Sequence, residues 1–354
     1  MGNILETLGK TPLWVRVGGL ALAWLVLVSV VHWRVNYDHG TREVVRMGYM
    51  PVITNLAAPI LDAATLDGDG VRLEALKFSS FADMGEALRG GRIDVAFMIA
   101  PLAVVLHQQG GGVRVVYIGN RHESTLVGSR DKGMASIEDL AGKTVAVPMR
   151  YSGHNLSVRR ILDQAGLAGR VNIVEMNPPD MAPAMAAGAL DAYCVGEPFA
   201  ARAVLGGYAR VIHYVEDVWP GFICNLVLVR EGMVENRSGL VAMLVRGAAR
   251  SGVWAKRNPE KAARIAARYW NQPVEVVKYA MNTPEDRIVY DRFVPKQEEL
   301  REMAQLMVRF GLTGSADVDG LVDDRFARGA DLSGVDGLDS ILAGGTEGLS
   351  AEGP

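Results

Sequence analysis

"AMAAGALDAYCVGEP", residues 184–198, has the same pattern of turn residues as "ALRGGRIDVAFMIAP", residues 87–101. In both stretches a helical pattern ends at a glycine suited to a left-handed cap, and an apolar-Asp pair follows at the same offset. A buried strand pattern comes next, and it closes on a proline that fits the first turn of another helix. The glycines are Gly91 and Gly188, and the prolines are Pro101 and Pro198. The repeat predicts two similar α/β units in one chain.

The surrounding sequence extends both units in the same way. From Val44 onward, short β-rich runs alternate with helical patterns, which indicates βαβ units and a mostly parallel sheet. Each unit begins with a strand and a loop, "YMPVIT" (49–54) or "MRYSG" (149–153), followed by a helix start near Asn55 or His154. Ligands of open α/β sheets bind at the carboxyl ends of the strands. We therefore expect two lobes that close on a small ligand about a hinge.

The bulk composition narrows the function. The chain has 354 residues, 49% apolar and 22% charged, with a net charge of −3, which argues against nucleic acid as a partner. Cys194 and Cys224, the two cysteines, lie in apolar runs, with no CxxC motif and no Cys/His cluster spaced for zinc. We interpret them as buried small hydrophobic residues, and a single bridge between them stays open as an alternative.

The N-terminus carries an apolar segment from Val17 to Trp33, preceded by Lys10 and Arg16. No small-residue cleavage site and no lipoprotein cysteine follows it, so we predict an uncleaved signal anchor of about 17 apolar residues, near the lower limit for spanning a bilayer. A cleaved signal and a buried helix are the alternatives. This predicts a single-pass protein of the cytoplasmic (inner) membrane, with the bulk of the chain in the periplasm or extracytoplasmic space. At the other end, residues 313–354 are rich in Gly, Asp and Ser, which predicts a flexible tail with solvated acids rather than a calcium loop.

Enzymatic motifs are missing from the sequence: it has no GxSxG, P-loop, HExxH or correctly placed GxGxxG. A Cys194–His154 nucleophile pair is disfavoured, because Cys194 lies within a strand and nothing nearby would lower its pKa. Glu197 precedes a helix start, where it either compensates the helix dipole or lines a cleft or hinge. We therefore expect no enzyme, no cofactor and no metal site.

Basic residues follow several predicted strands: Lys77, Arg150 and His154. A cation beside a helix N-terminus suits a small anion such as a carboxylate or sulfonate. The alternatives are that Lys77 and Arg150 face solvent and that His154 only caps its helix.

Four stretches resemble the substrate-binding proteins of ABC importers for nitrate, bicarbonate, sulfonates and taurine. They are "GYMPVITNLAAPI" (48–60), "DVAFMIAPLAVVL" (94–106), "VPMRYSGHNLSVR" (147–159) and "NPPDMAPAMAAGALDAYCVGEPFAARAV" (177–204). The resemblance covers about Arg46 to Gly311. It implies a two-lobed type II periplasmic-binding-protein fold with a hinge, no catalysis, and delivery of a small molecule to an ABC permease and its ATPase.

The resemblance also implies which residues meet the ligand. The family's Ser-x-His-Asn segment falls on Ser152, His154 and Asn155, with the histidine similar to an oxyanion ligand. Loop residues fall on 49–54 and 98–100, where Met98 and Ile99 are more apolar than in the anion-binding branch and favour a ligand with some apolar surface. With the residues reasoned above, the predicted ligand site is Tyr49, Pro51, Thr54, Lys77, Met98, Ile99, Arg150, Ser152, His154, Asn155 and Glu197.

The predicted organisation has four parts. They are an anchor and linker at 1–42, lobe 1 at 43–125 with 223–312, lobe 2 at 126–222, and the tail at 313–354. The predicted function is a membrane-anchored solute-binding protein for a small anionic or polar metabolite. The alternatives are an anchored sensor or accessory subunit of a membrane complex, and an enzyme resembling the thiamine-pyrimidine synthases, whose cysteine-rich motif is missing.

Overall fold

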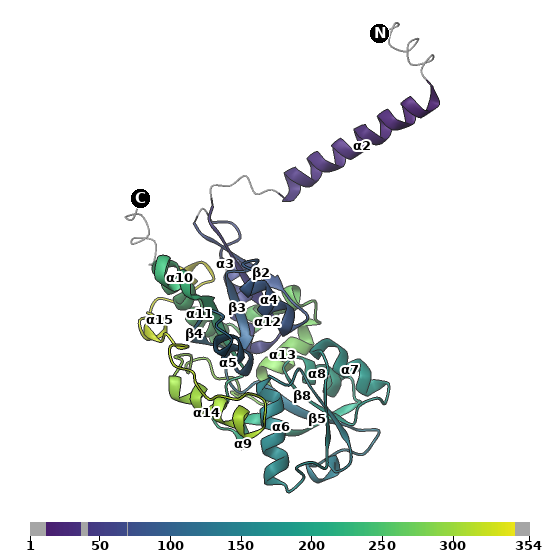
Figure 1. The fold of residues 1–354 in the computed structure, drawn as a ribbon, viewed down its shortest axis with the longest axis vertical. Helices are drawn as coiled ribbons and strands as arrows, with labels where there is room; N and C mark the ends of the chain where they lie inside the picture. The colour runs from purple at the N-terminus through teal and green to yellow at the C-terminus, as the bar shows by residue number, and fades with distance from the viewer. Residues whose placement is uncertain (1–11, 37–41, 69, 344–354) are drawn as a thin grey trace. The chain divides into compact units, whose positions relative to one another are not determined.

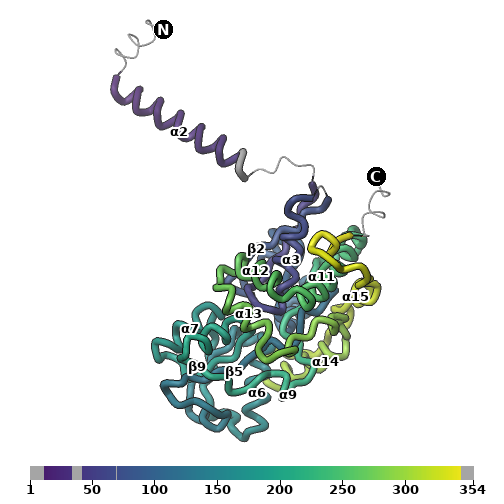
Figure 2. The backbone as a smooth tube through the Cα atoms, turned by 180° about the vertical axis from the view of Figure 1, so that it is seen from behind, coloured from purple at the N-terminus to yellow at the C-terminus, as the bar shows by residue number. Residues whose placement is uncertain are grey.

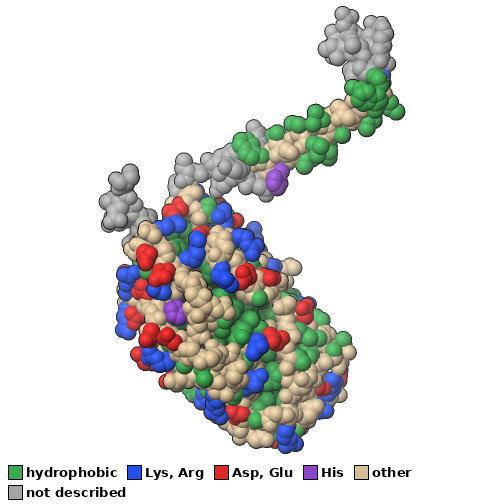
Figure 3. Space-filling model, in the orientation of Figure 1, with side chains coloured by type: hydrophobic (Ala, Val, Ile, Leu, Met, Phe, Trp, Pro, Cys, Tyr) green, Lys and Arg blue, Asp and Glu red, His purple; other side chains and the backbone are tan. Residues whose placement is uncertain are grey.

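The computed structural model describes residues 12–36, 42–68 and 70–343. Contacts divide the chain into two units, Met1–Glu43 and Val44–Pro354, which are described separately. In the first unit, helix α2 (Leu13–Asn36) contains a 21-residue segment, Leu13–Trp33, with a mean hydropathy of 2.0. That segment is long and apolar enough to cross a membrane, although a signal sequence has the same properties. Figure 3 shows the hydrophobic side chains along this helix.

The second unit is an α/β structure with two five-stranded sheets. The first sheet has the order β2-β1-β3-β10-β4 and the second the order β7-β6-β8-β5-β9 (Figure 1). The first sheet contains β1 (Val44–Tyr49), β2 (Arg72–Lys77), β3 (Val95–Ile99), β4 (Val113–Ile118) and β10 (Asn225–Arg230). The second contains β5 (Ser124–Ser129), β6 (Thr144–Val147), β7 (Asn172–Glu175), β8 (Ala192–Gly196) and β9 (Ala209–Tyr214). In the first sheet β2, β1 and β3 are parallel, and β10 pairs antiparallel with β3. In the second sheet β7, β6 and β8 are parallel, and β5 pairs antiparallel with β8. The chain enters β5 and β10 directly after it crosses from the other sheet. We call each sheet with its helices a lobe.

The helices follow the strands as the repeat predicted. In the first lobe they are η1 (Ile53–Asn55), α3 (Ala57–Ala64), α4 (Phe81–Arg89) and α5 (Ala100–Gln108). In the second lobe they are η2 (Glu138–Leu140), α6 (Gly153–Gln164), α7 (Pro178–Ala186), α8 (Phe199–Leu205) and α9 (Val215–Val218). The later helices are α10 (Glu231–Asn236), α11 (Ser238–Arg257), α12 (Pro259–Trp270), α13 (Val274–Asn282), α14 (Gln297–Arg309), α15 (Arg325–Arg328) and η3 (Asp339–Ile341). Figure 2 shows α3, α11 and α12 together, and α13 contacts α8 of the second lobe.

The repeat is confirmed in detail by its two aspartates. Asp94 accepts a hydrogen bond from the Arg46 N–H at 2.9 Å, and Asp191 accepts one from the Thr144 N–H at 2.8 Å. In return, the N–H of each aspartate donates to the carbonyl of that same strand residue. Both aspartates therefore fix the start of a buried strand to its neighbour. The preceding Gly91 and Gly188 positions have φ of +69° and +77°, the left-handed conformation expected of a helix cap.

Hydrophobic packing forms three clusters, one of which continues through both lobes. The first fills the space between the first sheet and α3, α11 and α12. The third lies between the second sheet and α6. The second cluster extends from Met98 and Ile99 in the first lobe to Tyr193 and Phe199 in the second. The lobes are thus joined by a continuous apolar core, while charges of both signs are interspersed on the exposed face in Figure 3.

Residues 313–343 are packed, which differs from the flexible tail expected there; residues 344–354 lie outside the described residues. Leu321 and Val318 are fully buried, and Val115 of β4 donates its N–H to the Leu321 carbonyl at 2.8 Å. The guanidinium of the buried Arg250 on α11 binds the carbonyls of Asp331, Ser333, Gly334 and Ser340. The sequence did not predict this packing, because the segment has few apolar residues. Hydrogen bonds to the edge strand β4 and to the Arg250 side chain hold the segment in place.

Leu321→Ala is expected to lower the free energy of unfolding by about 2–4 kcal/mol, because it removes a fully buried side chain from the core. Urea denaturation of the purified protein measures the change. Leu205→Ala is the matched control, because Leu205 is 48% exposed and should change stability by less than about 0.5 kcal/mol. Equal effects of the two substitutions would contradict the packed position of this segment.

Candidate functional site: the groove and crossing segments between the lobes

Two chain segments connect the lobes. The first, residues 119–123, runs from β4 to β5, and the second, residues 219–224, runs from α9 to β10. Arg121, 3% exposed, joins them: its guanidinium binds the Gly221 carbonyl and both carboxylate oxygens of Glu299 on α14. Only glycine fits at position 119, because a Cβ there would lie 2.2 Å from the Thr54 carbonyl oxygen. We call these two stretches the crossing segments. Because they connect the lobes, any rotation of one lobe relative to the other must change their backbone conformation.

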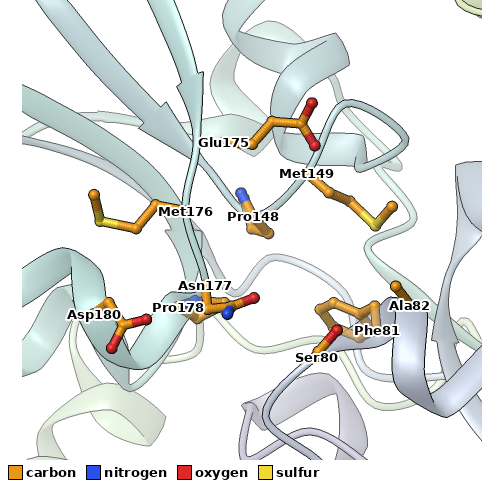
Figure 4. Close-up of a pocket in the computed structure, with 10 residues that line it drawn as sticks. All are labelled: Ser80, Phe81, Ala82, Pro148, Met149, Glu175, Met176, Asn177, Pro178 and Asp180. Atoms are coloured by element: carbon orange, nitrogen blue, oxygen red, sulfur yellow. The ribbon is translucent and has the colours of Figure 1, made fainter.

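An open groove of about 450 Å³ lies between the lobes at the carboxyl ends of β2, β6 and β7. The start of α4 forms one side of it, and the loop after β6, the end of β7 and the start of α7 form the other (Figure 4). The lining residues are Ser80, Phe81, Ala82, Pro148, Met149, Glu175, Met176, Asn177, Pro178 and Asp180. This is the place where open α/β sheets bind ligands.

The groove is mixed in character. It offers two carboxylates, Glu175 and Asp180, and two thioethers, and its described lining includes no lysine or arginine. Glu175 Oε2 already accepts a hydrogen bond from the Arg150 N–H at 2.9 Å. Ser80 caps α4 by accepting from the Asp83 N–H, whereas α7 begins with two prolines and so has few free N–H groups at its start. The groove therefore suits a small polar molecule with some apolar surface.

None of the residues predicted for the ligand site is among the ten that line this groove. Met98 and Ile99 are fully buried in the cluster shared by both lobes, and Tyr49 is 1% exposed with its hydroxyl donating to the Tyr269 carbonyl. The predicted first-loop residues Pro51 and Thr54 are also buried. Protein surrounds these five side chains in this structure, so their contact with a ligand stays a prediction.

The basic residues and the helix cap lie nearer to the groove. Lys77 is exposed at the end of β2, and Arg150 is exposed directly after the lining residue Met149. Ser152 caps α6 by accepting from the Asn155 N–H at 3.1 Å. The side chain of Asn155 in turn binds the Arg150 carbonyl at 2.7 Å. Ser152 and Asn155 therefore shape the loop that carries Arg150, and Ser152 rather than His154 caps the helix.

Glu197 lies between the lobes, with both oxygens bound within the protein. Oε1 accepts from the Thr125 hydroxyl at 2.9 Å, and Oε2 accepts from the Ala201 N–H at 2.8 Å. The Arg287 guanidinium is 3.9 Å away, while the Glu197 carbonyl accepts the Ile53 N–H of the first lobe. Burial raises the pKa of this carboxyl, and Arg287 opposes the rise. The predicted cleft-rim residue is thus a buried part of the lobe junction.

His154 faces the crossing segments. Its Nε2 lies 3.0 Å from Ser124 Oγ and 3.7 Å from Cys224 Sγ, and the Glu123 carboxylate belongs to the same cluster. Burial lowers the pKa of His154 to about 3, raises that of Glu123 to about 7 and raises that of the Cys224 thiol. Cys194 and Cys224 are both free and buried. Because these residues are far apart in the sequence, spacing rules could not find the cluster.

A family match agrees with this geometry. Residues 38–269 match the NMT1-like family. The chain belongs to the NMT1-like family. Its fold is the two-lobed α/β fold of the periplasmic binding proteins. The fold expected from the repeat is therefore confirmed.

Relatives of this NMT1-like chain include proteins named for solute binding and for nitrate import. It is 24% identical to an aliphatic sulfonates-binding protein of Bacillus subtilis, over 83% of this chain and 90% of that protein. It is 29% identical to a nitrate import ATP-binding protein of Synechococcus elongatus over 51% of this chain, but this match spans only 30% of that longer relative. A ligand-binding component of an ABC-type import system from Staphylococcus aureus, solved with zinc bound, has a TM-score of 0.75. It is 23% identical, with 82% of this chain and all of that chain covered, a likeness that shows the fold.

Glu197→Ala is expected to destabilise the protein by about 2–4 kcal/mol, because it removes two buried hydrogen bonds and the partner of a buried guanidinium. Chemical denaturation gives the free energy. Glu175→Ala, at an exposed groove carboxylate, is the control and should cost less than about 1 kcal/mol. A Glu197 variant as stable as the control would show that the carboxylate does not support the lobe junction.

Proposed function

We propose that this protein is an extracytoplasmic solute-binding protein that captures a small anionic or polar metabolite between its lobes for an ABC importer. The groove at the carboxyl ends of β2, β6 and β7 is the observation that carries the proposal, because it opens between lobes joined by two crossing segments. Relatives that bind sulfonates for import support the same role. The protein would bind its solute without catalysis and deliver it to a permease and ATPase.

The groove also supports a narrower ligand class. Glu175 and Asp180 disfavour a bare inorganic anion such as nitrate, because like charges repel across a site of this size. They favour a solute that carries an amine beside its anionic group, and the thioethers of Met149 and Met176 fit a short alkyl part. An aminoalkyl sulfonate has these three features, and a taurine-binding protein of Escherichia coli is 27% identical over 56% of this chain.

A thermal-shift screen tests this function. Taurine, an alkanesulfonate without an amine, nitrate and bicarbonate are compared, and the amine-bearing sulfonate is expected to raise Tm most. At a concentration 100 times Kd the gain is about 2.7 kcal/mol, or about 5 °C. A screen in which no solute raises Tm, with the protein instead copurifying with another membrane complex, would support a sensor or accessory subunit.

Ala82→Trp should reduce the solute-induced shift, because an indole at this exposed lining position fills the groove. Calorimetric titration is expected to show at least about a tenfold loss of affinity, or about 1.4 kcal/mol. Glu86→Trp places the same side chain on α4 outside the lining and should bind as the unaltered protein does. Equal affinity in both variants would place the solute elsewhere.

We further propose that the Leu13–Trp33 segment anchors the protein in the inner membrane. The full chain should stay in the membrane pellet after an alkaline wash, whereas a chain that begins at Val44 should be soluble, because residues 44–354 form their own compact unit. A soluble full-length product whose N-terminus lies after Trp33 would instead identify a cleaved signal.

A further inference from the structure

We propose that Glu123, His154 and Cys224 form a binding site for a divalent transition-metal ion of the zinc class at the crossing segments. Each residue offers one donor atom, and these atoms all lie within 4.8 Å of one another. The three side chains are 0%, 2% and 4% exposed. This site is distinct from the groove, and the inference does not depend on the solute-binding function.

The donor set selects the class of metal. An imidazole nitrogen and a thiolate prefer borderline or soft ions, and they disfavour Mg²⁺ and Ca²⁺, which take oxygen ligands. Glutamate and cysteine each contribute one negative charge when they ligate, so a divalent ion leaves the buried cluster neutral. A neutral cluster costs far less to bury than one with a net charge. The charge balance therefore favours Zn²⁺ and Co²⁺ over a monovalent ion.

The geometry is near what such an ion requires. Zinc–sulfur and zinc–nitrogen bonds of about 2.3 and 2.0 Å at a tetrahedral angle place the two donors about 3.5 Å apart. Cys224 Sγ and His154 Nε2 are 3.7 Å apart. Ser124 Oγ, 3.0 Å from the same nitrogen and 3.1 Å from Glu123 Oε1, lies beside the fourth position. A small inward movement of the Glu123 carboxylate completes three protein ligands and leaves that position to the hydroxyl or to water.

The surroundings of Glu123 also point to a ligand. Its Oε2 is buried without a hydrogen-bond partner among the described residues, and an unmet buried acceptor costs about 1–3 kcal/mol. Gly196 makes the space for this carboxylate, because a Cβ at that position would lie 2.6 Å from Oε2. The Cys224 thiol is the group that faces this carboxylate, and an ion that replaces the thiol proton would take both groups as ligands.

A nucleophilic role for Cys224 fits these contacts less well. Its Sγ donates to the Asn225 side-chain oxygen at 3.1 Å, and burial raises the pKa of the thiol, which keeps it protonated. No substrate reaches a thiol that is 4% exposed in the closed lobes. A metal ion is small enough to enter when the lobes part, and it replaces the thiol proton as it binds.

The three proposed ligands come from both crossing segments and from α6, so a bound ion would link these parts of the chain. Glu123 ends the first crossing segment, Cys224 ends the second, and His154 is the second residue of α6. An ion bound by all three ties both connections between the lobes to the second lobe. Metal binding is therefore expected to raise Tm and to favour the closed arrangement.

The test uses the full chain in detergent, purified without a histidine tag and stripped of metal with a chelator. Co²⁺ is the probe, because a cobalt thiolate site gives near-ultraviolet charge-transfer absorption. We expect one Co²⁺ per chain, displaced by Zn²⁺, and a higher Tm with either ion. Cys224→Ser should abolish the charge-transfer absorption, and Glu123→Gln should weaken Co²⁺ binding at least about tenfold.

Cys194→Ser is the matched control, because Cys194 is also a free buried cysteine but lies outside the cluster. It should keep both the absorption and the affinity. Circular dichroism checks the folding of each variant, and the near-isosteric Glu123→Gln decides the outcome if Cys224→Ser does not fold. The proposal is overturned if the unaltered protein gives no thiolate absorption. It is also overturned if Cys224→Ser retains this absorption, or if folded Glu123→Gln binds Co²⁺ as tightly as the unaltered protein.

Discussion

The contact of Arg121 with the second crossing segment is the interaction on which the arrangement of the lobes depends. The chain passes between the lobes twice, and each passage supplies the antiparallel strand that completes the sheet it enters, β5 or β10. Arg121 joins the two passages through the Gly221 carbonyl, and Glu299 on α14 neutralises its buried charge. Breaking such a buried pair leaves an uncompensated charge, so the segments are held together strongly.

Polar residues pack around these passages beside apolar ones such as Phe222 and Ile223. Asn225 donates to Asn55, Asn120 donates to the Ile53 carbonyl, and Arg287 binds Glu216, Thr125 and the Ser124 carbonyl. Directional hydrogen bonds specify one geometry, whereas apolar contacts tolerate sliding. The neighbouring apolar cluster, which continues through both lobes, supplies the cohesion. The lobe junction thus combines a non-directional attraction with a network that fixes its geometry.

Sequence reasoning reached the repeat and the alternation of strands and helices within it because Gly, Asp and Pro act locally. Gly91 and Gly188 need a left-handed conformation, and Asp94 and Asp191 bind the strand beside them, so their spacing carries the fold. The site depends on contacts that spacing does not encode. The stretch "GNRHES" (119–124) carries no recognisable motif, yet its first five residues form the first crossing segment. Some of its partners, such as Arg292 and Glu299, lie more than 160 residues later in the chain.

Six of the eleven predicted ligand residues lie at the ends of β1, β3 and β8, and the loops that follow these strands meet one another in this structure. The Ile53 N–H donates to the Glu197 carbonyl across the lobes, so polar backbone groups of these loops are hydrogen-bonded to one another. The loops after β2, β6 and β7 do not meet and leave the groove. A solute that entered the inner loops would have to replace the Ile53–Glu197 contact, whereas one in the groove would add to it. The proposed binding in the groove would therefore not have to break this buried hydrogen bond first.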